Sequence, residues 1–596
     1  MKQTVAHLVR SAADRYEDAE AVVDGDVTLT FRQLGDQVLD FARAAIAHGV
    51  RPGDRVAIWA PNSARWLVAA LGTISAGATV VTVNTRYRGE EAADLLRRSA
   101  AVALFVHQDF LGYDYFGALR DAAGSAASGA TDLARTASRA NAAAPTAAAA
   151  AGTGSGAPAA DAEGTEGTQG TEGAEGTGGT EGTPVPGLPL LRYVVDISGA
   201  GPRVDGDGPS PWDDFMAAYD QVHEEQALGV LDGIRPTDIS HIIFTSGTTG
   251  RPKGVLLHHR ALVRLYAAYS GIWGIQEGDR YLVPLPFFHT GGQSAILSCL
   301  IRGATILPLP VFDPATVLEL VDRLRVSVLI GAPTVFSALL DHPDRSRYDL
   351  SSLRLAATGA AVVPVRLVER CLAELPFTNF ITAYGMTECH GTATMCRDDD
   401  SPATVAATSG SALPSVEVRV VDPEGHDVGV GEPGEIWVRG YNVTRGYLDD
   451  PEATAEAIDL DGWLHTGDIG HLDARGNLAI TDRLKDIYIV GGFNVSPAEV
   501  EQVMARHPAV SEAAVIGVPD DRMGEVGRAY VIPRPGAEAD PEEIGAWLRA
   551  RLANFKVPRS IAVVDVLPRN ATGKVQKTEL RAAYRDAAAD PVADRN

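Results

Sequence analysis

Short apolar runs alternate with a helical pattern of apolar positions near the start of the chain. Residues 55–60 form a compact apolar run, and residues 66–74 place apolar side chains three and four positions apart, as one face of a helix does. A second apolar run follows at residues 78–83. A strand, a helix and a strand in this order predict parallel strands with a helix packed on the sheet.

The same alternation returns in the middle of the chain. Residues 304–309 and 326–330 are apolar runs of strand length, and Asp313-Pro314 opens a helix that runs to about residue 325. Aspartate is a favoured helix cap, and proline suits the first helical turn. We therefore expect an α/β fold with parallel or mixed sheets flanked by helices.

After residue 482 the pattern changes to that of a smaller α+β unit. One helix is expected from 496–497 through 506, another opens at Pro541, and short strands are expected at 513–518, 528–532 and 561–566. A chain of 596 residues exceeds what one hydrophobic core usually organises. We therefore expect two domains, over residues 1–482 and 483–596.

A low-complexity stretch interrupts the first domain at about residues 121–187. Alanine, glycine, threonine and glutamate dominate it, and no aromatic residue lies between Phe116 and Tyr193. Such a segment cannot bury enough apolar surface to offset its ordering entropy. The composition predicts a disordered insertion on a surface loop, with a functional tether as the alternative.

The composition also restricts the partners of the chain. Its 77 acidic and 52 basic residues give a net charge of −25, which argues against nucleic acid or an anionic membrane as a partner. No stretch approaches the ~18 apolar residues of a membrane span, and no apolar signal core follows the N-terminus, so we expect a cytoplasmic protein without stable membrane insertion. The four cysteines lack metal-site spacing and are expected to be reduced structural thiols.

A loop suited to phosphate follows the apolar run at residues 242–244. It reads Thr-Ser-Gly-Thr-Thr-Gly-Arg-Pro-Lys-Gly over residues 245–254. Glycines let the backbone turn its N–H groups toward an anion, hydroxyls add donors, and the lysine adds positive charge. The spacing differs from the Gly-x4-Gly-Lys-Ser/Thr loop of kinase-like enzymes. An ordinary surface turn is the alternative, and the candidate phosphate-binding residues are Thr245, Ser246, Gly247, Thr248, Thr249, Gly250 and Lys253.

Further motifs follow this loop in a fixed order. They read Pro-Phe-Phe-His at 286–289, Tyr-Gly-Met-Thr-Glu at 384–388, Gly-Trp-Leu-His-Thr-Gly-Asp at 462–468, Asp-Arg-Leu-Lys-Asp at 482–486 and Asn-Ala-Thr-Gly-Lys at 570–574. In this order they resemble the adenylate-forming superfamily of acyl-CoA synthetases, firefly-type luciferases and peptide-synthetase adenylation domains. The resemblance covers almost the whole chain apart from the low-complexity stretch and the last residues.

The resemblance implies a two-step reaction between a large N-terminal domain and a small mobile C-terminal domain. A carboxylate attacks the α-phosphorus of ATP and releases pyrophosphate, and a thiol then takes the acyl group and releases AMP. Both steps gather anions, so positioning and charge neutralisation are expected to carry catalysis rather than a protein nucleophile. The expected cofactors are ATP, Mg²⁺ and CoA, and the phosphate loop with Lys253 is expected to hold the β- and γ-phosphates.

The resemblance also implies roles for single residues of the large domain. Glu388 is the expected Mg²⁺ ligand, and Thr387 is expected to donate to the α-phosphate. Tyr384 resembles a ring that stacks on adenine, with core packing as the alternative. Asp468 and Arg483 are expected at the ribose, and a surface ion pair is the alternative for Arg483.

In the small domain, Lys574 is the expected catalyst of the first step, between the carboxylate and the α-phosphate. Lys485 matches the hinge about which this domain rotates between half-reactions. Gly491 and Gly492 match a loop that lines the pantetheine tunnel. A solvated lysine at 574 and an ordinary glycine turn at 491–492 are the alternatives.

The acyl pocket is expected near three short segments. His289 follows two aromatic residues where relatives keep a gate, and a core histidine is the alternative. Gly359 and Ala360 follow a strand expected at residues 353–357 and resemble a small-residue stretch beside adenine and the acyl chain. Ala383 stands where relatives that act on phenylpropanoids commonly have glycine, so acyl contacts of those enzymes are not carried over.

Three functions are open at this stage. The leading one is an ATP-dependent carboxylate-CoA ligase for a small-molecule acid, either a fatty acid or a bulky ring-bearing propanoate. Residues 482–501 look closest to actinobacterial fatty-acid-type CoA ligases, of which one subgroup activates a propanoate on a steroid-ring remnant. An enzyme that loads a carrier protein is the first alternative, although no carrier domain follows the C-terminal unit. A non-catalytic nucleotide-binding module is the second, and nothing in the sequence fixes the number of subunits.

Overall fold

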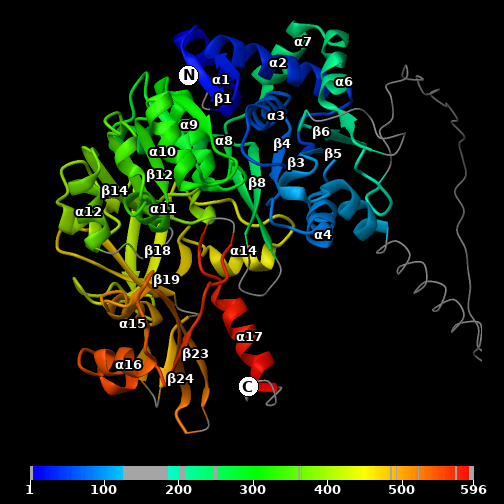
Figure 1. The fold of residues 1–596 in the computed structure, drawn as a ribbon. Coiled ribbons are helices and arrows are strands. Elements are labelled where there is room, and N and C mark those ends of the chain that lie inside the picture. The colour runs from blue at the N-terminus through cyan, green and yellow to red at the C-terminus, as the bar shows by residue number, and fades with distance from the viewer. Residues whose placement is uncertain are drawn as a thin grey trace, which may run out of the picture.

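Among the residues that the structure describes, the strands form four sheets. The N-terminal elements, blue to green in Figure 1, lie at the top of the view, and the orange and red C-terminal elements lie at the bottom. The computed structural model describes residues 4–124, 185–199, 208–245, 252–359, 363, 365–483, 486–490, 493–520, 522–570 and 573–589.

The first sheet has seven strands in the order β7-β6-β5-β3-β4-β8-β9. β3 and β4 are parallel neighbours joined by α3, which confirms the strand-helix-strand unit expected from the apolar runs at 55–60 and 78–83. β9 returns antiparallel to β8 at the edge, so the sheet is mixed. The strands are β3 Arg55–Trp59, β4 Thr79–Thr82, β5 Ala103–Val106, β6 Tyr193–Asp196, β7 Ser210–Pro211, β8 Ile239–Thr245 and β9 Lys253–His258.

The second sheet has nine strands in the order β16-β15-β14-β13-β12-β10-β11-β1-β2. β11 and β12, both expected from sequence, lie on opposite sides of β10 and run parallel to it. The helix between them, α10, starts with Asp313 as its cap and proline in its first turn, as expected. The strands are β1 Glu20–Asp24, β2 Val27–Thr30, β10 Arg280–Val283, β11 Thr305–Pro308, β12 Val328–Gly331, β13 Leu355–Gly359, β14 Asn379–Tyr384, β15 Thr394–Met395 and β16 Ser411–Ala412.

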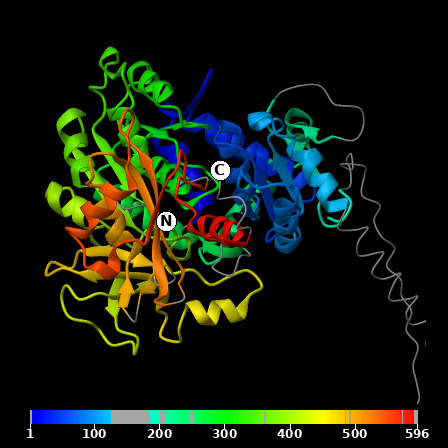
Figure 2. The ribbon, with the colours of Figure 1, turned by 60° about the horizontal axis from the view of Figure 1, so that its bottom comes forward.

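Two smaller sheets complete the protein. β17 to β20 form an antiparallel sheet, and β21 to β25 form the C-terminal sheet, which Figure 2 brings forward. The C-terminal sheet packs its helices over hydrophobic clusters of its own, as expected for a separate α+β unit. The strands are β17 Val416–Val421, β18 Gly434–Gly440, β19 Leu464–Leu472, β20 Leu478–Arg483, β21 Tyr488–Val490, β22 Phe493–Val495, β23 Val510–Asp520, β24 Gly524–Pro533 and β25 Ser560–Val563.

Helices cover the faces of both large sheets, and one buried cluster runs from the first sheet through α3 to the second. α3 is buried at every residue except Arg65, because it lies between these two layers. The α/β class with a large N-terminal part and a small C-terminal unit is therefore confirmed. The helices are α1 Val5–Tyr16, α2 Phe31–Ala47, α3 Ala64–Ser75, α4 Gly89–Ser99, α6 Trp212–Met216, α7 Glu224–Gly233, α8 His259–Trp273, α9 Thr290–Arg302, α10 Pro314–Leu324, α11 Pro333–Leu340, α12 Val365–Glu374, α13 Pro402–Ala407, α14 Pro451–Ala457, α15 Pro497–Met504, α16 Pro541–Arg549 and α17 Lys577–Ala589.

Packed residues extend further into both ends of the low-complexity stretch than the sequence predicts. A helix at residues 115–124 runs past the expected start at 121, and Ala123 is buried against the first sheet. Val185 joins the same cluster before the expected end at 187. Small apolar residues at both ends therefore pack, and the remaining residues, 125–184, lie outside the described part of the chain.

Two further expectations concern membranes and cysteines. In the described part of the chain, none of the helices has the length and apolar character needed to cross a bilayer. The four cysteines are buried free thiols. Burial raises the pKa of Cys389 to about 12, so this thiol stays protonated at neutral pH.

Candidate active site

Four parallel strands of the nine-stranded sheet end at one edge. β10, β12, β13 and β14 are neighbours that run parallel to one another. His289 and Ala332 follow β10 and β12, Gly359 is the last residue of β13, and the motif at 384–388 begins with the last residue of β14. Open α/β sheets bind ligands at the carboxyl ends of their strands. Candidate residues that are up to a hundred positions apart in sequence therefore gather at the edge where a ligand is expected.

The predicted phosphate loop joins β8 to β9. Thr245, the last residue of β8, is the register partner of Lys253, the first residue of β9. The Arg98 guanidinium at the end of α4 donates to the Pro252 carbonyl oxygen at 2.7 Å and lies over the Phe244 ring. α4 thus fixes the base of the hairpin directly beside Lys253.

Glu388 lies in the short turn η4 (Thr387–Cys389) that follows β14. Glu388 and Thr387 are buried, with 7% and 5% of their surface exposed. The Tyr447 hydroxyl donates to Glu388 Oε1 at 3.1 Å, and the Thr444 backbone N–H donates to the Glu388 carbonyl oxygen at 2.7 Å. The carboxylate is therefore held by a segment 59 residues further along the chain.

Tyr384 contacts Asp468, whose strand pairs with that of Arg483, and the nucleoside roles of these three residues stay predictions. The Tyr384 hydroxyl donates to Asp468 Oδ2 at 2.8 Å, and Asp468 and Arg483 are register partners on β19 and β20. Burial, and then the charge of Asp468, raise the pKa of Tyr384, so the phenol remains a donor at neutral pH. This hydrogen bond fixes the orientation of the buried Asp468 carboxylate.

Lys574 lies in a loop that reaches the same edge of the nine-stranded sheet. Gly573 lies beside Ala332: a Cβ added to Gly573 would lie 3.9 Å from the Cβ of Ala332. Asn570 Oδ1 accepts from the Lys574 N–H at 2.9 Å, and Arg569 donates to the Gly573 carbonyl oxygen at 2.6 Å. The described residues of this loop are thus held by hydrogen bonds to one another where Gly573 meets the ends of the strands.

His289 caps α9, and its Nδ1 accepts from the Gly291 N–H at 3.2 Å. Burial lowers the pKa of His289 to about 4, so the ring is neutral at pH 7 and carries its proton on Nε2. Gly359 and Ala383 are register partners at the ends of β13 and β14. Gly359 and Ala383 thus lie at the ends of neighbouring strands, and His289 follows β10 at the same edge of the sheet. That the three residues share an acyl pocket stays a prediction.

Several predicted site residues lie outside the described residues, so their positions stay predictions. They belong to the tip of the phosphate loop, the small-residue stretch after β13, the hinge and the glycine pair after it. They are Ser246, Gly247, Thr248, Thr249, Gly250, Ala360, Lys485, Gly491 and Gly492.

The structure adds residues that the sequence reasoning missed. Tyr447 contacts both Glu388 and Lys253, and Arg98 supports the phosphate hairpin. Both residues lie far from the motifs in sequence, so no local pattern connects them to the site. The one local hint for Tyr447 is its place after a glycine and shortly before the Pro-Glu that opens α14.

The described residues fit a metal held mainly by substrate. Among them, no group of three or more histidine, cysteine, aspartate or glutamate side chains could form a metal cage. Glu388 is a buried carboxylate. Tyr447 connects it to the phosphate hairpin, because Tyr447 contacts both Glu388 and Lys253. Mg²⁺ commonly binds one or two carboxylates together with phosphate oxygens and water, so this donor set suits it.

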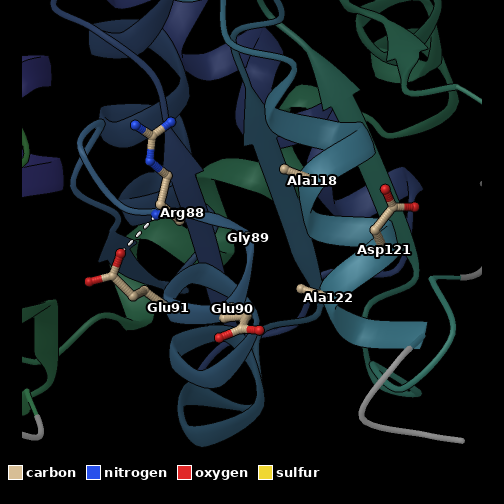
Figure 3. Close-up of a pocket in the computed structure, with 7 residues that line it drawn as sticks. All are labelled: Arg88, Gly89, Glu90, Glu91, Ala118, Asp121 and Ala122. Carbon is tan, nitrogen blue, oxygen red and sulfur yellow. Dashed lines mark hydrogen bonds between the residues drawn. The ribbon is translucent and has the colours of Figure 1, made fainter.

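A separate hollow of about 500 Å³ lies between the start of α4 and the helix at residues 115–124 (Figure 3). Its lining includes three acidic side chains, Glu90, Glu91 and Asp121, and one arginine. The Arg88 guanidinium lies over the Tyr113 ring at 4.8 Å. An acidic lining disfavours a polyphosphate, so the hollow does not compete with the edge of the nine-stranded sheet as a nucleotide site.

Comparisons with known proteins identify the family and the fold of the chain. The family model of the AMP-binding enzymes matches residues 9–448, and that of their C-terminal domain matches residues 499–574. The chain is similar over 98% of its length to ATP-bound MatB from Rhodopseudomonas palustris, with 28% identity, 99% of that chain covered and a TM-score of 0.76. It is similar over 99% of its length to the anthranilate CoA ligase AuaEII with anthranoyl-AMP, with 26% identity, 99% of that chain covered and a TM-score of 0.78.

Two curated relatives are closer in sequence. Each is named a 7a-methyl-1,5-dioxo-octahydro-1H-inden-4-yl propanoyl:CoA ligase. The one from Rhodococcus jostii is 48% identical over 97% of this chain and 98% of its own length. The one from Mycobacterium tuberculosis is 46% identical over 97% and 98%. The chain therefore belongs to the AMP-binding enzyme family, as an AMP-forming acid–thiol ligase of the acyl-CoA synthetase type.

Proposed function

We propose that this ligase activates a propanoate attached to a bulky, oxygenated ring system. The observation that supports this substrate is the pair of relatives with 48% and 46% identity over 97% of the chain, both named for an indane-ring propanoyl group. A fatty-acid substrate, also expected from sequence, is the less favoured choice because relatives with other names are more distant, such as the putative acyl-CoA synthetase YngI at 33% identity. The cytoplasmic location stays a prediction.

In the first step, we propose that the substrate carboxylate attacks the α-phosphorus of ATP beside Lys574. The support is that the Lys574 loop meets the strand ends at Ala332, on the edge that also carries Glu388. Lys574 would neutralise charge as the carboxylate approaches, and Thr387 would donate to the α-phosphate. Lys253 would hold the β- and γ-phosphates until pyrophosphate leaves.

The nucleoside end of ATP would bind at the Tyr384 hydrogen bond. Asp468 is oriented by the Tyr384 hydroxyl, and its side-chain oxygens would receive the ribose hydroxyls. Arg483, its register partner, would contact the same ribose. Mg²⁺, held by Glu388 and phosphate oxygens, would supply charge neutralisation on the triphosphate.

For the second step, we propose a rotation of the C-terminal domain about Lys485. Arg483 belongs to β20 in the sheet of Asp468, whereas Asp486 pairs with Arg581 of α17 at 2.9 Å. Only positions 484 and 485 separate these two anchors, so the domain boundary is better drawn after Arg483 than before it. Gly491 and Gly492 would then line the path of the CoA thiol. Lys485→Pro should block acyl-CoA formation while pyrophosphate exchange persists.

The two alternatives raised from sequence are now disfavoured. The relatives that cover almost the whole chain are named CoA ligases, which opposes transfer to a carrier protein. A non-catalytic module would not need a buried, oriented Asp468 and a Lys574 backbone held by Asn570 at one edge.

The decisive experiment measures AMP and acyl-CoA formation from purified protein, ATP, Mg²⁺ and CoA over an acid panel. The panel contains the indane-dione propanoate, 3-cyclohexylpropanoate and straight-chain acids of similar carbon number. We expect kcat/KM to be highest for the bicyclic acid by at least about tenfold, since one missing methylene alone changes such values by 10-fold or more. A preference for the straight-chain acids would refute the substrate, and no AMP from any acid would refute the activity.

A further inference from the structure

One tyrosine lies between the two charged groups that the proposed function assigns to the triphosphate. The Lys253 ammonium lies 4.9 Å from the centroid of the Tyr447 ring, and the Tyr447 hydroxyl donates to Glu388 Oε1 at 3.1 Å. We propose that Tyr447 is a positioning residue that keeps Lys253 and Glu388 apart, so that both charges face the triphosphate rather than each other. This proposal rests on the proposed function of that site.

The backbone around Tyr447 is tied to both groups. On one side, the Leu448 N–H donates to the Gly254 carbonyl oxygen at 2.7 Å, directly after Lys253. On the other side, the Thr444 N–H donates to the Glu388 carbonyl oxygen at 2.7 Å. The segment 444–448 therefore connects the phosphate hairpin, where Tyr447 forms a β-bridge with Val255 of β9, to the turn that carries Glu388.

The conformation just before Tyr447 requires glycine. Gly446 has φ +121°, and a Cβ at this position would collide with the Thr454 side chain. Thr454 Oγ1 in α14 accepts from the Tyr447 N–H at 3.0 Å. The main chain at Tyr447 is thus fixed by α14, so the ring position does not depend on side-chain packing alone.

A phenol suits this place because it satisfies both charges without neutralising either. Its ring face attracts the Lys253 ammonium through the aromatic quadrupole. Its hydroxyl donates to the Glu388 carboxylate, and this contact leaves the charge of the carboxylate in place. A direct ion pair between Lys253 and Glu388 would instead cancel both charges before the nucleotide binds.

Two variants separate the two contacts, and a third serves as a control. Tyr447→Phe removes the hydroxyl and keeps the ring, whereas Tyr447→Leu removes both. Tyr441→Phe is the matched control, since this ring also holds an arginine, Arg264 at 4.0 Å. The Tyr441 hydroxyl is buried and has no hydrogen-bond partner among the described residues.

The measurement is calorimetric binding of α,β-methylene-ATP, which cannot release pyrophosphate, with Mg²⁺ and with EDTA. The ratio of the two dissociation constants gives the tightening by metal. We expect Tyr447→Phe to reduce this ratio by about tenfold, a usual loss when the partner of a metal ligand is removed. The dissociation constant in EDTA should stay within about twofold, but Tyr447→Leu should raise it by about threefold or more.

A double-mutant cycle with Glu388→Gln makes the proposal falsifiable even if Tyr447→Leu does not fold. In the Glu388→Gln background, Tyr447→Phe should cause no further loss of the metal effect. A wild-type metal ratio in Tyr447→Phe, an equal loss in Tyr441→Phe, or additive losses in the cycle would each overturn the proposal. If the wild-type protein neither binds the analogue nor exchanges pyrophosphate, the proposed function fails instead.

Discussion

The loop that carries Lys574 allows a quantitative test of the first half-reaction. Arg569 donates from Nη1 to the Gly573 carbonyl oxygen at 2.6 Å and forms an ion pair with Glu512 of β23. Arg569→Gln should therefore loosen the loop next to Lys574 while the C-terminal sheet stays folded. The side chains of Arg569 and Glu512 are 27% and 30% exposed, so solvent screens their attraction only in part.

The size of the effect follows from these contacts. A hydrogen bond from a charged group contributes about 1.5–3 kcal/mol, and partial exposure favours the lower end. A loss of about 1.5 kcal/mol in the placement of Lys574 corresponds to about a tenfold lower rate. We expect this loss in ATP–pyrophosphate exchange. The conversion of supplied acyl-adenylate to acyl-CoA should stay within about twofold, because Lys574 is proposed to act only in adenylation.

The assay compares the two half-reactions in Arg569→Gln and in a control, Lys556→Gln. Lys556 is 25% exposed and pairs with Glu499 at 2.7 Å in the same domain, and neither residue belongs to the loop at 569–574. The control reports what the loss of any C-terminal ion pair does, and we expect it to change both half-reactions alike. Equal loss of both half-reactions in Arg569→Gln, or exchange within twofold of wild type, would refute this role of Arg569.

Lys574→Ala should abolish pyrophosphate exchange but still form acyl-CoA from supplied acyl-adenylate, and equal loss of both steps would contradict its assignment. Tyr384→Phe should raise the KM for ATP about tenfold, because Asp468 loses an oriented donor; an unchanged KM would show that Asp468 needs no such support. Burial lowers the pKa of His241 to about 3. The contribution of the neutral ring to the unfolding free energy is therefore fully present above pH ~6.5, and it is lost as the pH falls toward 3. His241→Leu should flatten the decline in unfolding free energy between pH 6 and pH 4 by up to about 1.4 kcal/mol per pH unit, and an unchanged slope in denaturant titrations would count against it.

The sequence predicted the elements whose signals are local. α10 has its cap and proline at the positions where the sequence places them, and β3, α3 and β4 follow the expected alternation. The lateral order of strands was not predictable in the same way, because β10 lies between β11 and β12 through contacts that neither apolar run encodes. The helix α17 was also not predicted, because its sequence consists mostly of alanine and charged residues.

The site shows the same division. Tyr384, Glu388, Asp468 and Lys574 stand in motifs whose residue order is recognisable from sequence. Tyr447 and Arg98 are tied to that site only by contacts across long separations: Tyr447 reaches back 59 residues to Glu388, and Arg98 reaches forward 154 residues to Pro252. Such residues support a motif from outside it, so they become visible only when the sheets are assembled.

The residues that position Glu388 and Lys574 lie in different domains, which suits an enzyme whose small domain is proposed to rotate. Thr444 and Tyr447 hold Glu388 near Lys253 entirely within the large domain. Arg569 and its neighbours order the Lys574 loop entirely within the small domain. If the domain turns between Arg483 and Asp486, as proposed, it can withdraw Lys574 after adenylation without breaking the contacts that shape either half. Each set of charges would then be preassembled, so closing the domain would align them without rebuilding them.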